Sequence, residues 1–166
     1  GGFYLTDPVT GAAGRYFEVE FRKVDSAAAA IFSQILLKNA SGIDYSPGTG
    51  ISLQTNDLVG LLDGVGQGGI TTVTFEQWYK LKLQINSDDD IEVYLDDVLE
   101  QTIADSGWIG NDVYWMTNIF YTTPAMEYRN FKLEDPNFSS GPYISLPGDE
   151  NSTSDNHAFI VKPSGI

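Results

Sequence analysis

The chain has 166 residues, 42% of them hydrophobic, and its 23 acidic and 9 basic residues give a net charge of −14. This length suits one domain with a two-layer core. The charge argues against a nucleic-acid binder, which neutralises phosphates with Lys and Arg, and against a protein of anionic membrane surfaces. The 17 Gly, 9 Tyr and 9 Phe favour sheet over helix.

Two absences narrow the class of protein further. The chain contains no Cys, which excludes disulfides, thiolate metal sites and cysteine nucleophiles. No apolar run approaches the ~20 residues of a membrane span, so no membrane insertion is expected. The chain begins Gly1-Gly2 with neither an initiator Met nor a signal peptide, and we expect a processed or excised piece of a larger protein.

The first regular element is a strand over residues 16–24, which follows a turn-rich start. Apolar and polar side chains alternate there, as they do in a strand with one buried and one wet face. Phe17, Val19 and Phe21 share one face, and the other face carries Tyr16, Glu18, Glu20 and Arg22.

Residues 27–38 fit two structures. Four alanines behind Asp25-Ser26 resemble a capped helix. The β-forming residues that follow, and the sheet expected on both sides, favour a strand from about Ile31. Further along we expect a loop over 43–50, strands over 51–55 and 58–62, a flexible turn over 63–69, and a strand over 70–74.

The clearest pattern is a hairpin of two alternating strands over residues 78–85 and 91–95, joined by a polar turn. Its inward residues are expected to be Tyr79, Leu81, Leu83, Ile85, Ile91, Val93 and Leu95. Strands over 99–103, 113–121 and 128–134 follow, with a loop over 106–110. The run 113–121 is apolar on both faces, which indicates a strand covered on both sides.

Composition changes after residue 135. Residues 136–166 form a linker-like tail with two short apolar pieces, which either complete the sheet or join a neighbouring module. About ten strands with short turns and no convincing long helix predict an all-β fold, an antiparallel two-sheet sandwich or barrel.

The hairpin also carries a family resemblance. Trp78-Tyr79-x-Leu81-x-Leu83, a polar turn, and Ile91-x-Val93-Tyr94-Leu95-Asp96-Asp97 resemble the signature hairpin of concanavalin A-like lectin/glucanase domains, the laminin-G-like branch above all. That branch ends its hairpin on Gly, where this chain has Asp97. The resemblance covers roughly residues 15–135, helped by the YFEVEF and YRNFKL runs. It implies a jelly-roll domain over 1–135 that carries a glycan or protein ligand, without implying catalysis.

Two carboxylates raise the alternative of a glycosidase. Glu18 and Glu20 share a strand face, at about the separation that a retaining glycosidase needs. The laminarinase-type branch has a further acid where this chain has Lys23, and Arg22 on the same face favours salt bridging instead. His157, the only His, is expected to be a surface residue without a metal role.

We expect no cofactor, but the sequence offers two candidate sites for a structural calcium ion. Asp88-Asp89-Asp90 cluster oxygen ligands in the hairpin turn, and Glu134-Asp135 do so at the end of the last strand. A solvated turn explains the first cluster equally well.

Sugar-binding sites place aromatic rings against the apolar faces of sugars, framed by carboxylates and amides. Strand parity turns Tyr16, Trp78, Tyr94 and Tyr128 outward, and Tyr45, Trp108 and Tyr114 lie in or near loops. Trp78 also suits a core position under a loop. Among the aromatic residues in loops, Trp108 is the best candidate for stacking on a sugar. The predicted ligand-binding residues are Trp108, Tyr45, Tyr114, Tyr94, Tyr128 and Trp78.

The leading hypothesis is a non-catalytic, carbohydrate-directed recognition or adhesion module within a larger extracellular or virion-associated protein. The alternative is a structural virion or assembly protein, such as a capsid-decorating, fibre or tail component, which binds other protein chains. Its tail over 143–166 would pair with a neighbouring chain of an oligomer. A glycan hydrolase or lyase is the third hypothesis.

Overall fold

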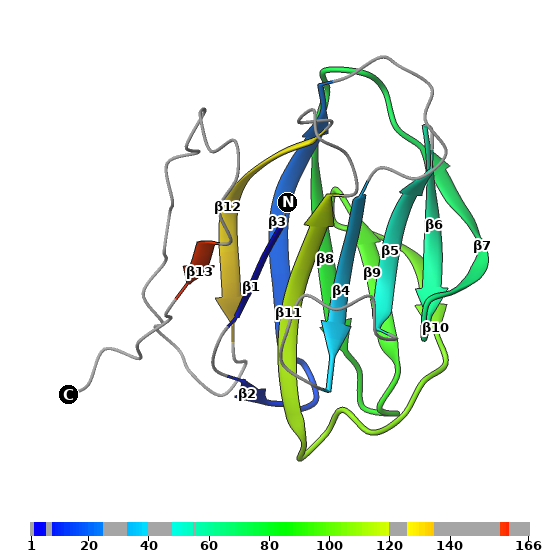
Figure 1. Cartoon of the computed structure of the whole chain (residues 1–166). Helices are drawn as coiled ribbons and strands as arrows, with labels where there is room; N and C mark the ends of the chain where they lie inside the picture. The colour runs from blue at the N-terminus through cyan, green and yellow to red at the C-terminus, as the bar shows by residue number, and fades with distance from the viewer. Residues whose placement is uncertain are drawn as a thin grey trace.

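The protein is an all-β, two-sheet jelly-roll sandwich (Figure 1). The computed structural model describes residues 2–5, 8–24, 33–39, 48–54, 56–119, 126–134 and 157–159. These residues form strands and turns and contain no helix, so none of them could cross a membrane as a helix. The predicted fold class is confirmed.

Sheet one has eight strands and forms one layer. Its order is β13-β1-β11-β4-β5-β6-β7, and the short β2 pairs with β11. The ladders are antiparallel apart from the parallel pairing of β1 with β13. The strands are β1 (Gly2–Leu5), β2 (Val9–Thr10), β4 (Ser33–Lys38), β5 (Thr49–Gln54), β6 (Asp57–Leu62), β7 (Val65–Thr72), β11 (Asp112–Ile119) and β13 (His157–Phe159).

Sheet two has five strands in the order β10-β9-β8-β3-β12, all antiparallel, and lies behind sheet one in Figure 1. Strand β3 is therefore flanked by β8 and by β12, which follows it by about a hundred residues. The strands are β3 (Tyr16–Lys23), β8 (Trp78–Ile85), β9 (Ile91–Leu95), β10 (Val98–Ile103) and β12 (Met126–Glu134).

The core lies between the two sheets. Strands β3, β8 and β9 alternate strictly between buried and half-buried residues, so the alternation predicted for them is confirmed. Their inward residues pack against those of sheet one, and Trp115 of β11 contacts Phe17 and Phe131 with ring centroids 5.4 and 5.8 Å apart. Removing this apolar surface from water is the main source of the stability of the sandwich.

Strand β11 is covered on both faces, as predicted. Trp115 belongs to the main core, whereas its neighbour Met116 points to the opposite face and packs with Leu36 and Leu61. The ambiguous segment is a strand in its described part, β4, and residues 25–32 lie outside the described residues.

The flexible turn predicted over residues 63–69 is wrong. The turn consists of Asp63 and Gly64 alone, with φ of 49° and 77°, and β7 begins at Val65. Two residues with positive φ form the tight hairpin turn that matches the twist of the flanking strands. Asp96 and Asp97 form a second turn of this kind between β9 and β10, with φ of 50° and 68°. Asp97 thus stands at the turn position where the family that the hairpin resembles has Gly.

The tail contributes one described strand. β13 pairs in parallel with β1, with Phe3 opposite His157 and Leu5 opposite Phe159. The apolar piece over 158–161 therefore overlaps a strand of this sheet, and the piece over 143–146 lies outside the described residues. The division of the chain at residue 135 stays a prediction.

Candidate functional site

The outward face of sheet two gathers rings, carboxylates and cations. Alternate residues of a strand point to the same side, so the residues between the core positions form one surface. Arg129 is exposed, and the other side chains are half-buried. The outward face consists of Tyr16, Glu18, Glu20 and Arg22 of β3; Trp78, Lys80, Lys82 and Gln84 of β8; Glu92 and Tyr94 of β9; and Glu127, Arg129 and Lys132 of β12.

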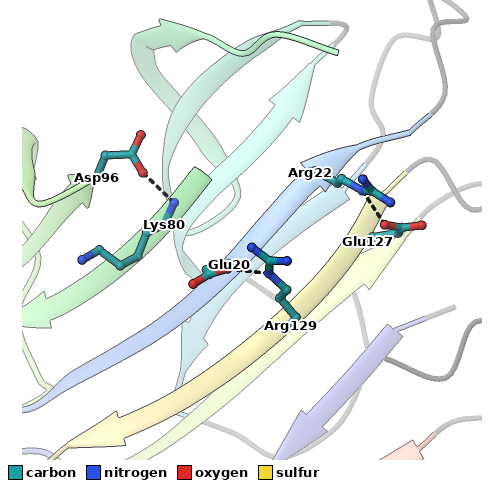
Figure 2. Close-up of polar contacts among 6 residues, drawn as sticks. All are labelled: Glu20, Arg22, Lys80, Asp96, Glu127 and Arg129. Carbon is teal, nitrogen blue, oxygen red and sulfur yellow. Dashed lines mark hydrogen bonds and ion pairs between the residues drawn. The ribbon is translucent and has the colours of Figure 1, made fainter. Parts of the chain in front are cut away.

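The strand register places opposite charges side by side on this face. Arg22 Nε donates to Glu127 Oε2 at 2.5 Å, and Arg129 Nε donates to Glu20 Oε2 at 2.5 Å (Figure 2). Burial raises the pKa of Glu20, but hydrogen bonds from Asn130 and Arg129 outweigh it and lower that pKa below its ordinary value. Partly exposed pairs of this kind contribute little stability, typically about 0–1 kcal/mol, and their main effect here is to orient side chains.

At the rim, Lys80 is tied to the turn between β9 and β10. Its Nζ donates to Asp97 Oδ2 at 2.5 Å, and its backbone N–H donates to Asp96 Oδ1 at 2.8 Å, the contact drawn in Figure 2. The hydrogen bond from Lys80 also lowers the pKa of Asp97. The two acidic turn residues therefore fix the end of the hairpin.

Trp78 lies on the outward face and not in the core, so the core position weighed for it is wrong. The guanidinium carbon of Arg129 lies 3.8 Å from its ring centroid, and that of Arg22 lies 5.0 Å away. Arginine stacks on indole through its planar charge and the negative ring face. Two arginines thus hold the ring in place at the surface.

Tyr94 and Tyr16 also lie outward, as strand parity predicts. Lys82 Nζ lies between them, 3.8 Å from the Tyr94 ring centroid and 5.5 Å from that of Tyr16. The Tyr94 hydroxyl donates to Glu92 Oε2 at 2.7 Å, and this bond, with burial, raises the pKa of Tyr94. The rings are therefore bracketed by charged groups of both signs.

Glu18 and Glu20 share this face, as predicted. Glu18 lies opposite Lys82 on β8 and Lys132 on β12, and Glu20 is ion-paired with Arg129. The salt bridging predicted for this face is present, although the partner of Glu20 comes from β12 and not from its own strand. The sequence favours this salt bridging over a catalytic role for the two carboxylates, and these contacts do not test such a role.

Tyr128 faces inward, so its predicted outward position is wrong. The register of β12 against β3 shifts between Arg129 and Lys132, and Asn130 has a φ of 54°. A bulge of this kind inserts one residue and reverses the parity of everything beyond it. Tyr128 therefore packs against the core, its hydroxyl hydrogen-bonded to Ser33 of sheet one, and burial raises the pKa of Tyr128.

Trp108 lies in the predicted loop, but its exposed fraction is only 3% and its indole belongs to the core. Asp89 holds the backbone of this loop. Its carboxylate accepts the backbone N–H groups of Gly107, Trp108 and Ile109 at 2.7, 3.1 and 2.7 Å. Burial raises the pKa of Asp89, but the three donors together lower it below its ordinary value. Trp108 therefore offers no open ring face to a ligand, and the candidate site does not include it.

Two of the three aspartates in the first calcium candidate, Asp89 and Asp90, have carboxylates that accept hydrogen bonds from backbone N–H groups. The three donors above occupy Asp89, and Asp90 Oδ1 accepts the backbone N–H of Asp105 at 3.1 Å. Oxygens turned toward N–H groups do not fit a calcium ion, which needs several converging oxygens. Among the described residues, no group of three or more His, Cys, Asp and Glu is placed to hold a metal. Asp135 of the second candidate lies outside the described residues.

The remaining candidates lie elsewhere. Tyr114 is half-buried on the outward side of sheet one, opposite Lys38 of β4, and Tyr45 lies outside the described residues. Of the six predicted residues, the outward face brings together Trp78 and Tyr94. The cations Arg22, Lys82 and Arg129 were missed as site residues. Their outward parity was readable from the sequence, whereas their contacts with rings depend on which strands become neighbours.

No protein-family model matches this sequence, and no curated protein matches it either. Among solved structures, chicken galectin 2 is similar with a TM-score of 0.53 and 15% identity, covering 80% of this chain and 98% of its own. A human galectin-16 variant has a TM-score of 0.51 and 12% identity, covering 71% of this chain and 90% of its own. A sialidase has a TM-score of 0.51 and 8% identity over 92% of this chain, which spans only 12% of the sialidase. At such identities the likeness concerns the fold alone: this chain has the jelly-roll sandwich that galectins also have.

Proposed function

We propose that this domain binds carbohydrate through the outward face of sheet two. One observation carries the proposal: the rings of Tyr16, Trp78 and Tyr94 lie on a single sheet face, interleaved with carboxylates and cations. Sugars present apolar C–H faces to aromatic rings and hydroxyls to charged or amide groups, and binding sites pair both kinds of contact. An apolar patch would favour a protein partner instead.

The side chains of this face are held before any ligand arrives. Trp78 is stacked with Arg129, Arg129 is bonded to Glu20, and Tyr94 is bonded to Glu92. Groups fixed in advance lose less conformational entropy on binding, which leaves more of the contact free energy for affinity. This pre-organisation favours recognition over a merely solvated sheet surface.

The wider context is part of the same proposal. We place the domain in the laminin-G-like branch of the concanavalin A-like superfamily, supported by the hairpin from Trp78 to Asp97 and by the two-sheet jelly roll. We further propose a non-catalytic recognition or adhesion role at an extracellular or virion surface, where glycans are the ligands at hand.

Glycan-array screening followed by titration calorimetry tests the binding proposal. Replacing Trp78 by Ala should weaken binding about fivefold or more, because truncated aromatic anchors at interfaces commonly cost more than about 1 kcal/mol. Tyr114→Ala is the matched control, since it removes a half-buried ring from sheet one and should leave the affinity unchanged. Absence of any carbohydrate affinity in the wild-type chain would retire the proposal.

A second candidate, binding of other protein chains, is favoured by the edges of the sandwich. Val65 on β7 and Val98 and Leu99 on β10 are exposed large apolar side chains, and β7 and β10 are the end strands of their sheets. Edge strands with apolar side chains are the usual templates for added strands. Sedimentation equilibrium tests it: self-association that is lost in Val98→Lys supports it, and a monomer at all concentrations contradicts self-assembly.

A further inference from the structure

We propose that the carbohydrate recognised by the outward face is acidic, bearing carboxylate or sulfate groups, and that Arg129 and Lys82 are the two side chains that bind its charge. This inference rests on the proposed function and deepens it, because it names the chemical class of the ligand.

The first support is the distribution of positive charge. Five of the nine Lys and Arg residues of this acidic chain lie on the outward face, namely Arg22, Lys80, Lys82, Arg129 and Lys132. Lys23 and Lys38 are only 2% exposed, and Lys162 lies outside the described residues, which leaves Arg15 elsewhere. The face also carries four carboxylates, those of Glu18, Glu20, Glu92 and Glu127, so its formal net charge is +1, against −14 for the whole chain. An anionic ligand is therefore repelled less there than over the rest of the described surface.

The second support is the geometry of Arg129. Its guanidinium is stacked on Trp78 at 3.8 Å, and its Nε is bonded to Glu20 (Figure 2). A guanidinium has five N–H donors, and among the described residues only the Nε donor is used. The two terminal amino groups, with four donors, are left for a ligand. Such a paired donor edge matches a carboxylate or a sulfate in bidentate geometry.

The third support is the environment of Lys82. Its Nζ lies over the rings of Tyr94 and Tyr16 and makes no hydrogen bond or ion pair with any described side chain. Lys80 on the same strand differs, because its Nζ is bonded to Asp97. An ammonium group held by rings alone keeps its three donors for an anion. Lys82 is therefore the second anion-binding position.

Arg129 and Lys82 lie too far apart to bind the same acidic group of one sugar. Arg129 lies opposite Glu20, Lys82 lies opposite Glu18, and β3 runs between them. Two strand spacings across and two residues along place their Cα atoms about 12 Å apart. This separation favours an oligosaccharide with repeated acidic groups over a single acidic sugar. Glu18 lies between the two cations and selects against a ligand that carries a negative charge there.

The test compares three soluble polysaccharides by titration calorimetry at low and high salt: polygalacturonate, dextran sulfate and uncharged dextran. We expect binding of an acidic polymer that weakens as salt rises, because exposed charges are screened. Binding of polygalacturonate alone or dextran sulfate alone supports the proposal and identifies the group; binding of both supports the shared chemistry.

Substitutions of single cations test which side chains bind the acidic polymer. Arg129→Gln and Lys82→Gln should each weaken acidic-polymer binding about tenfold, as expected for the loss of a charged contact of 1.5 kcal/mol or more. Arg129→Lys keeps the charge but loses the bidentate edge, and should be intermediate. Arg15→Gln, which removes the same charge away from the face, is the matched control and should bind as the wild type. Thermal unfolding checks that each variant is folded.

The contrary outcomes separate this inference from the proposed function. Equal, salt-independent binding of uncharged dextran or another neutral glycan would overturn the acidic-ligand inference and leave carbohydrate binding standing. No binding of any charged or neutral glycan would overturn both. Acidic-polymer binding that Arg15→Gln weakens as much as Arg129→Gln would show a diffuse charge effect and overturn the assignment to these two residues.

Discussion

The outward face of sheet two and the loop of residues 104–111 are both built from an aromatic residue and a neighbouring carboxylate, with opposite results. On the face, Glu20 binds the side chain of Arg129, which in turn stacks on Trp78 at the surface. In the loop, Asp89 binds three backbone N–H groups, and the indole of Trp108 lies in the core.

This difference lies in what satisfies the carboxylate. Backbone donors are fixed parts of the fold, so a carboxylate that binds three of them has its oxygens committed to structure. A cation on a long side chain keeps further donors when one is used, and these remain available to a ligand. The same residue types therefore indicate a structural tie in one region and a recognition surface in the other.

Exchanging the two tryptophans for Ala should separate these roles most strongly. Trp108→Ala empties a core position and should lower the free energy of unfolding by about 3–5 kcal/mol. Trp78→Ala removes a half-buried surface ring and should lower it by roughly 1 kcal/mol or less while weakening glycan binding. Urea denaturation measures the free energy of unfolding of both variants. Equal destabilisation would contradict the comparison.

Asp89→Ala should have the next largest effect. Three backbone N–H groups lose their acceptor. Hydrogen bonds to charged groups contribute about 1.5–3 kcal/mol each, but Asp89 is only half-buried, and each bond contributes less there. We therefore expect a total loss of about 2–3 kcal/mol in the free energy of unfolding. Trp108 fluorescence should shift toward that of an exposed indole. Asp88→Ala is the matched control, because Asp88 is exposed and its backbone N–H, which the substitution keeps, donates to Asn86 Oδ1. A full-sized loss in this control would contradict the assignment.

The stability of the loop should also depend on pH. Asp89 has a pKa lowered from its ordinary value of 3.8, so the folded chain binds that proton less tightly than the unfolded chain does. The stabilisation is therefore complete above pH 3.8 and is lost as the pH falls through the lower folded value. Unfolding experiments from neutral pH into this acidic window should show a smaller decline in Asp89→Asn than in the wild type. Parallel curves would exclude Asp89 as the titrating group.

The arrangement of β3, β8 and β9 could be predicted from sequence because it depends on a local rule. Apolar residues at every second position must share a face, and Phe17, Leu81 and Val93 are all buried accordingly. The outward positions of Tyr16, Trp78 and Tyr94 follow from the same parity. The contact of Trp78 with Arg129 does not follow, because it needs β12 beside β3, and strand neighbours distant in sequence leave no periodic signal.

The predicted exposure of Trp108 in its loop was wrong for a different reason. Trp108 stands in a polar, Gly-flanked segment, which is typical of a surface loop. The backbone N–H of Trp108 donates to Asp89, which lies in another turn some twenty residues earlier and belongs to a candidate calcium cluster that a solvated turn explains equally well. A cluster of aspartates has the same appearance in the sequence whether it binds a cation or backbone N–H groups.

Tyr128 was misplaced by a bulge, and its replacement gives the smallest expected effect. Asn130 adds one residue to β12, so parity counted back from Leu133 gives the wrong face for Tyr128. Tyr128→Phe keeps the ring and removes the hydroxyl bonded to Ser33, and should lower the free energy of unfolding by about 1 kcal/mol without altering glycan binding. Urea denaturation and calorimetry of the same variant measure the two quantities. A loss of affinity with unchanged stability would place Tyr128 on the outward face after all, and would move the boundary of the candidate site across β12.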